Sequence, residues 1–292
     1  GFWGERRRGE PGWVAFDRHR FPRVLGDARY GDDNSYLLDL GPEPGLRIQE
    51  RDAAPVDDGL PRRGSLPFVL RQEPSKVYWA WHLTSDDVWF WDEFSLGEAD
   101  VSRSYVVAVP DADPAGGPAT VRAAGLPRMP LGSAAPVRAR LSAGEPETAL
   151  DDRSWQGIAR QTLAGDLPGP PGPGAELKVT LTLPREGGSP GVRLHLDWIE
   201  VAYDRLLKAM GAELALTAPA APSRLQVRGL GEGDLLALDL GDPRRPVRLG
   251  GLALSRDAEG RQATFATAAG GGGYWLGSEA AFRRPKQIAA LG

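Results

Sequence analysis

The sequence predicts an all-β protein, built from antiparallel β-sandwich or jelly-roll domains in tandem with little helix. Glycine and proline are abundant, at 38 and 26 of 292 residues, and they are spread along the whole chain. That distribution is typical of many short strands joined by turns. Apolar and polar residues also alternate in short segments, as expected of strands with one buried face. Signals for helix are rare.

An N-terminal β-rich segment is predicted over residues 1–75. Short apolar runs occur at residues 13–16, 35–40 and 46–48 and are separated by turn residues. The last two runs flank Gly41-Pro-Glu-Pro-Gly45, which is typical of a hairpin connection.

A jelly-roll-like sandwich is predicted over residues 76–208. The region contains at least six alternating segments in about 130 residues, a density that fits an antiparallel sandwich. The predicted strands are Val77–His82, Val88–Phe94, Tyr105–Val109, Val137–Leu141, Leu177–Leu183 and Val192–Tyr203.

The last of these strands changes phase. Alternate apolar residues lead up to Trp198, and the pattern then resumes one residue out of step at Ile199. Because a strand has period 2, such a shift moves the buried face to the other side. We expect a β-bulge or a corner between two packed sheets here.

A small Ig-like sandwich is predicted over residues 209–292. Alternating segments recur with turns every 8–12 residues. Residues 203–210 fit two helical turns and a continuation of the preceding strand equally well. The predicted strands are 213–216, 224–227, 235–240, 247–249, 263–266 and 274–276.

Composition excludes several classes of function. The net charge of −4 gives no basic field for nucleic acid. The chain has no cysteine, which excludes disulfides, thiolate metal sites and a cysteine nucleophile within it. No apolar run approaches the roughly 20 residues of a membrane helix, so no membrane span is expected. The chain starts at Gly1 without a visible signal peptide, and we expect a processed product or an excerpt.

Two pairs of tryptophans form the densest aromatic cluster. Trp79 and Trp81 share one strand face, as do Trp89 and Trp91. Such pairs can stack on sugar rings in a carbohydrate-binding module. They can equally form a core between sheets, since a buried tryptophan hides on the order of 200 Å². The core is the favoured interpretation.

Four acidic residues flank the same predicted hairpin: Asp86, Asp87, Asp92 and Glu93. Their oxygens are suitable ligands for Ca²⁺. The spacing is not that of an EF-hand, so solvated turn charges are favoured and no cofactor other than this calcium alternative is expected.

Other motifs carry little chemistry. Gly187-Gly-Ser-Pro-Gly191 matches G-x-S-x-G, but a strand follows it where a nucleophile elbow needs a helix. The three histidines, His19, His82 and His195, show no metal-ligand spacing. His195 lies in an alternating strand and is expected to face solvent.

Five segments, in order, resemble the region that precedes the catalytic domain in gingipain-type cysteine peptidases. That family includes the sortase-like peptidase of the type IX secretion system. The segments are Asn34–Leu40 with Gly45–Ile48, Trp155-Gln-Gly157, Leu196-Asp-Trp-Ile-Glu-Val-Ala-Tyr-Asp-Arg205, Leu225–Leu230 with Leu238–Val247, and the Tyr274–Ile288 stretch. They correspond to family patterns such as "W-x-G" and "D-x-I-E-V-x-Y-x-R".

The resemblance implies a non-catalytic pro- or positioning region of an exported endopeptidase, located outside the cell or on its surface. Such a region acts by packing on the peptidase domain of the same parent, or on another protein surface. The resemblance also implies that residues 209–292 lead toward a peptidase domain that this sequence lacks. The family's catalytic His and Cys belong to that caspase-like domain, and no position here matches their motifs. This chain is therefore not expected to be an enzyme.

Two other classes remain open. One is a carbohydrate-binding module that uses the four tryptophans. The other is a self-assembling subunit of a surface layer or filament, which needs exposed strand edges or apolar patches.

Overall fold

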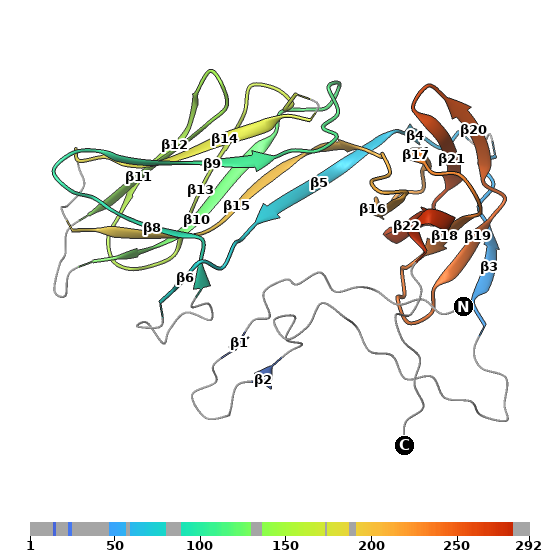
Figure 1. Ribbon diagram of the computed structural model, residues 1–292, viewed down its shortest axis with the longest axis horizontal. Helices are drawn as coiled ribbons and strands as arrows, with labels where there is room; N and C mark the ends of the chain where they lie inside the picture. Colours follow the sequence, from blue (N-terminus) through green and yellow to red (C-terminus); the bar gives the residue numbers. More distant parts are fainter. Residues whose placement is uncertain are drawn as a thin grey trace. The chain divides into compact units, whose positions relative to one another are not determined.

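The computed structural model describes residues 14–15, 23–24, 47–56, 59–79, 89–129, 136–172, 174–186 and 191–282. The regular secondary structure of the described residues is almost entirely strand, which confirms the predicted all-β class (Figure 1). One short 3₁₀ turn, η2 (Glu279–Ala281), is the exception in the described residues. The predicted strands at 13–16 and 35–40 lie wholly or largely outside the described residues, although β1 (Val14–Ala15) pairs with β2 (Arg23–Val24).

The chain divides into two compact units. The first comprises Gly1–Leu38 and Pro67–Asp204, and the second Asp39–Leu66 and Arg205–Gly292. The sequence predicts residues 1–75 as a block of their own. Of their described part, residues 47–56 and 59–66 belong to the second unit, and residues 14–15, 23–24 and 67–75 belong to the first.

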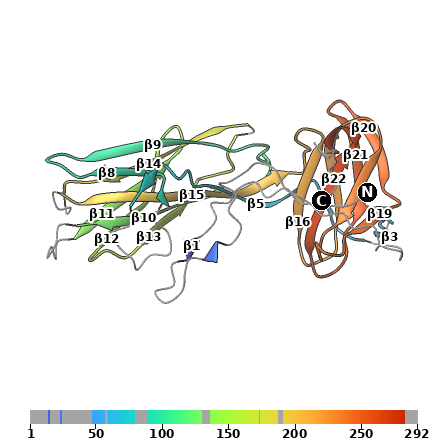
Figure 2. The same ribbon diagram turned by 60° about the horizontal axis from the view of Figure 1, so that its bottom comes forward.

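The first unit is a sandwich of two antiparallel sheets. One sheet has the order β13-β10-β15-β5, with β8 also paired to β15, and the other has the order β12-β11-β14-β9. Figure 2 shows the two layers from a second direction. The strands of the first sheet are β5 (Ser65–Gln72), β8 (Asp92–Ser95), β10 (Thr120–Arg128), β13 (Gln161–Asp166) and β15 (Arg193–Leu206). Those of the second are β9 (Val101–Ala108), β11 (Val137–Ala143), β12 (Thr148–Trp155) and β14 (Glu176–Leu183).

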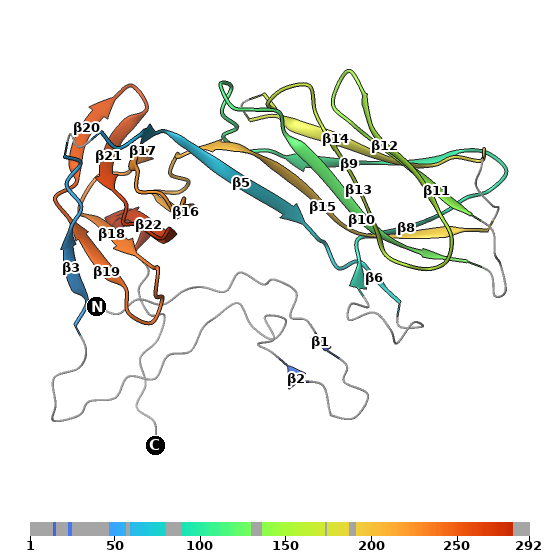
Figure 3. The same ribbon diagram turned by 180° about the vertical axis from the view of Figure 1, so that it is seen from behind.

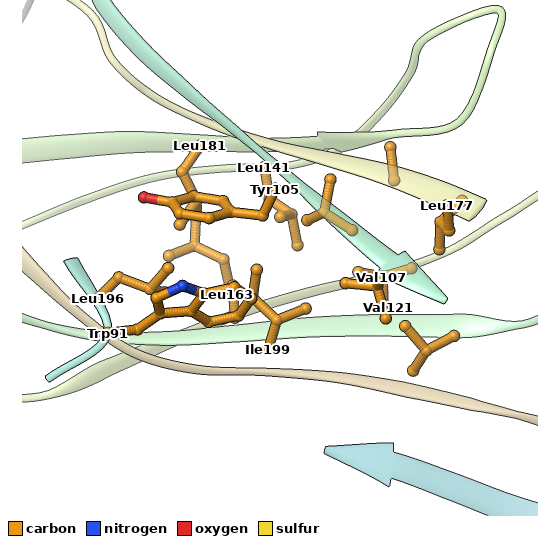
Figure 4. Packing of buried hydrophobic residues seen from close by; sticks show 14 of the residues in the cluster. Trp91, Tyr105, Val107, Val121, Leu141, Leu163, Leu177, Leu181, Leu196 and Ile199 are labelled. Carbon is orange, nitrogen blue, oxygen red and sulfur yellow. The ribbon is translucent and has the colours of Figure 1, made fainter. Parts of the chain in front are cut away.

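The core of this unit lies between its two sheets. Alternate residues of each strand point inward, as the period of 2 requires. Figure 4 shows Tyr105, Leu141 and Leu181 from one sheet facing a layer from the other. That opposing layer contains Trp91, Leu163, Leu196 and Ile199.

A two-stranded ladder accompanies the first sheet. It consists of β6 (Val77–Tyr78) and β7 (Trp89–Phe90), paired antiparallel with Val77 opposite Phe90. Figures 1 and 3 both show β6 beside the sheet that contains β8, β10 and β15. The segment between β6 and β7 includes Ala80–Val88, which lies outside the described residues.

The second unit is a smaller sandwich. Its sheets have the orders β16-β22-β18-β19-β3 and β20-β21-β17-β4. The strands are β3 (Gln49–Asp52), β4 (Arg62–Arg63), β16 (Glu213–Ala218), β17 (Arg224–Leu230), β18 (Leu235–Asp239), β19 (Val247–Gly250), β20 (Ala253–Asp257), β21 (Gly260–Ala266) and β22 (Gly272–Ser278). The two strands from residues 49–63 pair parallel to their neighbours, β3 with β19 and β4 with β17.

The phase shift in the predicted strand is a β-bulge. Within β15, Leu196 lies opposite Gly125 of β10 and Trp198 opposite Ala124, so Asp197 has no partner on that strand. The strand then continues to Leu206, which settles residues 203–206 as strand rather than helix. The bulge lets Leu196 and Ile199 both point into the core despite their odd spacing.

Candidate functional site

The most unusual polar group of the first unit is a buried histidine on the outer face of its five-stranded sheet. Leu194 and Leu196 belong to the core, so His195 between them points to the opposite face. The expectation that His195 faces solvent is wrong, because its exposed fraction is 0%. The alternation correctly placed it on the outer face but could not show that other side chains cover that face.

Aromatic rings from the β6–β7 ladder and its continuation cover His195. The Trp79 indole stacks on the imidazole with ring centroids 4.4 Å apart and planes within 5°. Phe90 packs at 5.1 Å with a tilt of 52°. The Arg128 guanidinium lies 5.8 Å from the centre of the Trp79 ring, within the range of a cation–π interaction.

The strand neighbours of His195 supply its charged environment. Glu93 of β8 lies directly opposite it, with Oε2 2.8 Å from His195 Nε2. The other carboxylate oxygen of Glu93 accepts a hydrogen bond of 2.7 Å from Arg193. Burial lowers the pKa of His195, and the Glu93 carboxylate opposes that shift. For Glu93, burial raises the pKa but the contacts with Arg193 and His195 outweigh it, so the net pKa is lowered.

A buried carboxylate lies two residues further along β15. Asp197, the bulge residue, has an exposed fraction of 0% and pairs with Arg160. Arg160 immediately precedes β13, whose first residue, Gln161, lies opposite Gly125 on β10. The register therefore brings Arg160 to the bulge, where its charge compensates the buried carboxylate.

The four predicted tryptophans do not form one surface in the described residues. Trp91 is buried at 8% and packs on Tyr105 at 4.9 Å inside the core, as the favoured interpretation predicted. Trp89 is half-buried and lies 5.1 Å from Tyr78, whereas Trp79 stacks on His195. Trp81 lies outside the described residues, and carbohydrate binding by this cluster stays a prediction.

The predicted calcium ligands are likewise only partly described. Asp86 and Asp87 lie outside the described residues. Asp92 accepts a hydrogen bond of 2.9 Å from Tyr105, and Glu93 is engaged by Arg193 and His195. Within the described ranges, no three His, Cys, Asp or Glu side chains are grouped so as to hold a metal ion. The calcium alternative stays a prediction.

The remaining candidate side chains cannot be placed. The G-x-S-x-G serine, Ser189, and the histidines His19 and His82 lie outside the described residues. No helix among the described residues is long and apolar enough to cross a membrane.

The sequence signal for the His195 cluster was present but ambiguous. Trp79, Glu93 and His195 each stand out in the sequence, yet they are separated by 14 and 102 positions. Only the pairing of β8 with β15 brings Glu93 to His195. A Glu opposite a His on neighbouring strands leaves no local pattern in the chain.

Comparison with known proteins gives a fold but no family. No family model and no curated protein matches the chain. Among solved structures, dimeric latent PorU from Porphyromonas gingivalis is similar, with a TM-score of 0.56 and 10% identity over 79% of this chain. A cycloisomaltooligosaccharide glucanotransferase from Paenibacillus sp. aligns over 73% of this chain and 44% of its own, with 9% identity and a TM-score of only 0.25, too low to support an argument. The chain spans 22% of the length of PorU, so the likeness shows a related all-β fold within a much longer protein.

Proposed function

We propose that this chain is a non-catalytic β-region of a larger exported protein of the gingipain type, and that it acts by packing on a peptidase domain or another protein surface. The observation that carries the proposal is the fold likeness to part of PorU, which extends over 79% of the chain. The ordered motifs of residues 34–288 support it independently, because they are features of the sequence alone.

The architecture suits a positioning role. Both units are β-sandwiches with an apolar core between their sheets. The two polar side chains with unusual surroundings, His195 and Asp197, are buried and therefore not accessible to a substrate. The absence of cysteine means that a cysteine-peptidase nucleophile would have to come from another part of the parent. Latent PorU provides an example of a similar β-region inside a protein that is held in a latent form.

The first test is the native polypeptide itself. Intact mass spectrometry with sequencing of both ends, on protein from its native source, shows what adjoins residues 1–292. A continuation past Gly292 that carries His and Cys in an α/β domain is the expected result. A native chain that ends at Gly292, with no co-purifying fragment, would contradict the peptidase role.

A second test addresses packing directly. The peptidase portion of the native protein is prepared with and without residues 1–292, and its melting temperature and endopeptidase rate are compared. The proposal expects residues 1–292, added as a separate chain, to raise the melting temperature of the peptidase portion or to change its endopeptidase rate. Equal values for both, across a wide concentration range, would contradict a positioning role.

A further inference from the structure

We propose that β9 accepts an added strand from another polypeptide: an extended segment in which apolar residues alternate and a carboxylate lies opposite Arg103. The inference concerns the free edge of one sheet in the first unit. It goes beyond the proposed function, because it depends on strand geometry and not on a likeness to peptidases.

The main-chain groups along the free side of β9 have no partner within the described ranges. β9 is an edge strand that pairs with β14 on one side only. The amide of Val109 donates to the carbonyl of Ala175, so in this antiparallel ladder the bonds to β14 fall on odd-numbered residues. Figure 2 shows β9 along one margin of the unit. The amides and carbonyls that point away from the sheet belong to Ser102, Ser104, Val106 and Ala108.

The residues with these free groups are exposed and have small side chains. Val106 is 58% exposed. The hydroxyls of Ser102 and Ser104 form hydrogen bonds of 2.7 and 3.0 Å with threonines of β14, which holds both side chains over the sheet. Residues 104–109, Ser-Tyr-Val-Val-Ala-Val, contain neither a charge nor a proline. An exposed edge of this composition readily pairs with another strand.

The opposite side of the sandwich is closed by side chains. There β13 is an edge strand, and β12 of the other sheet contacts it. Asp151 of β12 accepts a hydrogen bond of 3.0 Å from the amide of Ala164. Arg153 of β12 donates one of 3.1 Å to the carbonyl of Thr162. Two side chains therefore occupy edge groups of β13 that an added strand would need, and the structure describes no such side chain on the free edge of β9.

The core beside β9 favours apolar residues in the added strand. The Tyr105 hydroxyl donates to Asp92 of β8, so β9 lies over the β8 edge of the facing sheet. β5 lies on the same side, because β10 occupies the other side of β15. Its residues Phe68 and Leu70 are only partly buried against the core. An added strand would place every second side chain on the inner face, next to Tyr105 and Val107, where apolar groups would complete this cover.

Arg103 favours an acidic partner and disfavours a second copy of this chain. Its side chain points to the same face as that of Val107, is 54% exposed and lies 4.0 Å from Asp92, at the limit of an ion pair. Antiparallel pairing of β9 with a second β9 along its uncharged part would bring Arg103 opposite Val107 or Val109. An inward-pointing charge facing an apolar residue opposes such pairing. A carboxylate at that position instead forms a favourable cross-strand pair.

The test adds a synthetic strand to the full chain and follows amide hydrogen exchange by nuclear magnetic resonance. The probe is the capped peptide Val-Thr-Val-Thr-Val-Thr-Glu-Thr, which in antiparallel register places its glutamate opposite Arg103 and its valines on the inner face. The matched control has lysine in place of glutamate. The probe should slow exchange of the Ser104, Val106 and Ala108 amides. The Tyr105 amide, which is bonded to β14, should exchange slowly with and without the peptide.

Methylation of the peptide amides distinguishes strand addition from other modes of binding. In the antiparallel register the threonine amides face β9 and the valine amides point away from it. N-methyl groups on the threonines should therefore abolish the slowed exchange, whereas N-methyl groups on the valines should preserve it. Equal binding of the two methylated peptides would overturn the proposal.

Two substitutions in the chain complete the test. Val106→Pro removes an amide that points away from β14 and should abolish peptide binding, whereas Val106→Thr keeps the amide and should retain it. Arg103→Glu should weaken binding of the glutamate peptide by roughly tenfold and favour the lysine peptide, and it replaces Val106→Pro if that variant does not fold. Unchanged exchange at about millimolar peptide, or equal affinities of the glutamate and lysine peptides for the wild type, would contradict the assignment. Exchange that slows with protein concentration alone would assign the edge to a second copy and overturn the proposed partner.

Discussion

Trp79 and His195 stack with their ring planes within 5°, although 116 positions separate them in the chain. The contact covers the outer face of a sheet whose inner face already forms the core of the first unit. Sheets of antiparallel sandwiches commonly leave that outer face to solvent. Here a tryptophan, a phenylalanine and two arginines surround a buried imidazole, which makes this face the most distinctive surface of the unit.

Substitution of Trp91 distinguishes a core role from a sugar platform. Trp91→Ala removes a ring that is 8% exposed and packs on Tyr105, so the free energy of unfolding should fall by about 3–5 kcal/mol. Trp89→Ala is the matched control, because that ring is half-buried and should cost much less. Urea denaturation followed by circular dichroism measures both. If both substitutions changed the free energy of unfolding by the same small amount and both abolished glycan binding, the carbohydrate-binding alternative would be favoured.

The ion pair at the bulge should be sensitive to loss of either partner. Arg160→Ala leaves Asp197 buried without a compensating charge. We expect a loss of about 3 kcal/mol, near the lower end for buried pairs because the Arg160 side chain is 32% exposed. Asp152→Asn, in the exposed pair with Arg138, should change stability far less. A double-mutant cycle on Arg160 and Asp197 measures the coupling, and a coupling near zero would contradict this role.

A glycine on β13 has a packing reason. A Cβ placed on Gly165 would lie 2.6 Å from the carbonyl oxygen and 2.8 Å from the Cβ of Leu150, so the two sheets approach closely there. Gly165→Ala should destabilise the protein by about 1–3 kcal/mol through overpacking. Gly97→Ala is the control, because no atom lies within 4 Å of its Cβ position. Similar thermal denaturation curves for both variants would show that the sheets can separate at little cost.

Alkaline pH should destabilise the first unit through Tyr105. Burial raises the pKa of the Tyr105 phenol, and Asp92 adds to the shift while Arg103 opposes it. The unfolded chain therefore releases the phenolic proton first, from about pH 10. The free energy of unfolding falls as pH rises above that value.

Tyr105→Phe tests this sign. This substitution removes the hydrogen bond of 2.9 Å to Asp92, which should lower the free energy of unfolding by about 1 kcal/mol near neutral pH. It should also make the decrease in that free energy above pH 10 less steep. Tyr274, whose pKa burial also raises, contributes to the slope that remains. An unchanged alkaline slope in Tyr105→Phe would contradict the assignment.

The sequence predicted the bulge and strands such as β11, β14 and β15 because these depend on local alternation. It did not predict β5, β10, β12, β13 and β20. The odd spacing of Leu196 and Ile199 allowed few other solutions once the segment was identified as strand. The His195 cluster depends on register between distant strands, and the alternation of residues 192–203 carries no information about what covers the outer face. The sequence also did not predict that β3 pairs with β19 and β4 with β17, both in parallel. These pairings again join distant parts of the chain, and a two-residue strand such as β4 is too short to show alternation.

The second unit should require residues 47–66 in order to fold. Ala53 and Leu66 lie in its core, at 2% and 5% exposure. The amide of Ala53 donates to the carbonyl of Gly250, and the amide of Ala266 donates to that of Ala53, both at 2.9 Å. Removing the segment exposes both sheets of the sandwich along one edge. Residues 205–292 alone should therefore lack a cooperative thermal transition.

Fusion of residues 47–66 to that fragment through a flexible linker should restore the transition. The matched control carries Ala53→Asp and Leu66→Asp in the fused segment, which keeps the chain length but places charges in the core. Differential scanning calorimetry compares the three chains. A cooperative transition in residues 205–292 alone would show that the small sandwich predicted from residue 209 onward is complete without its N-terminal strands.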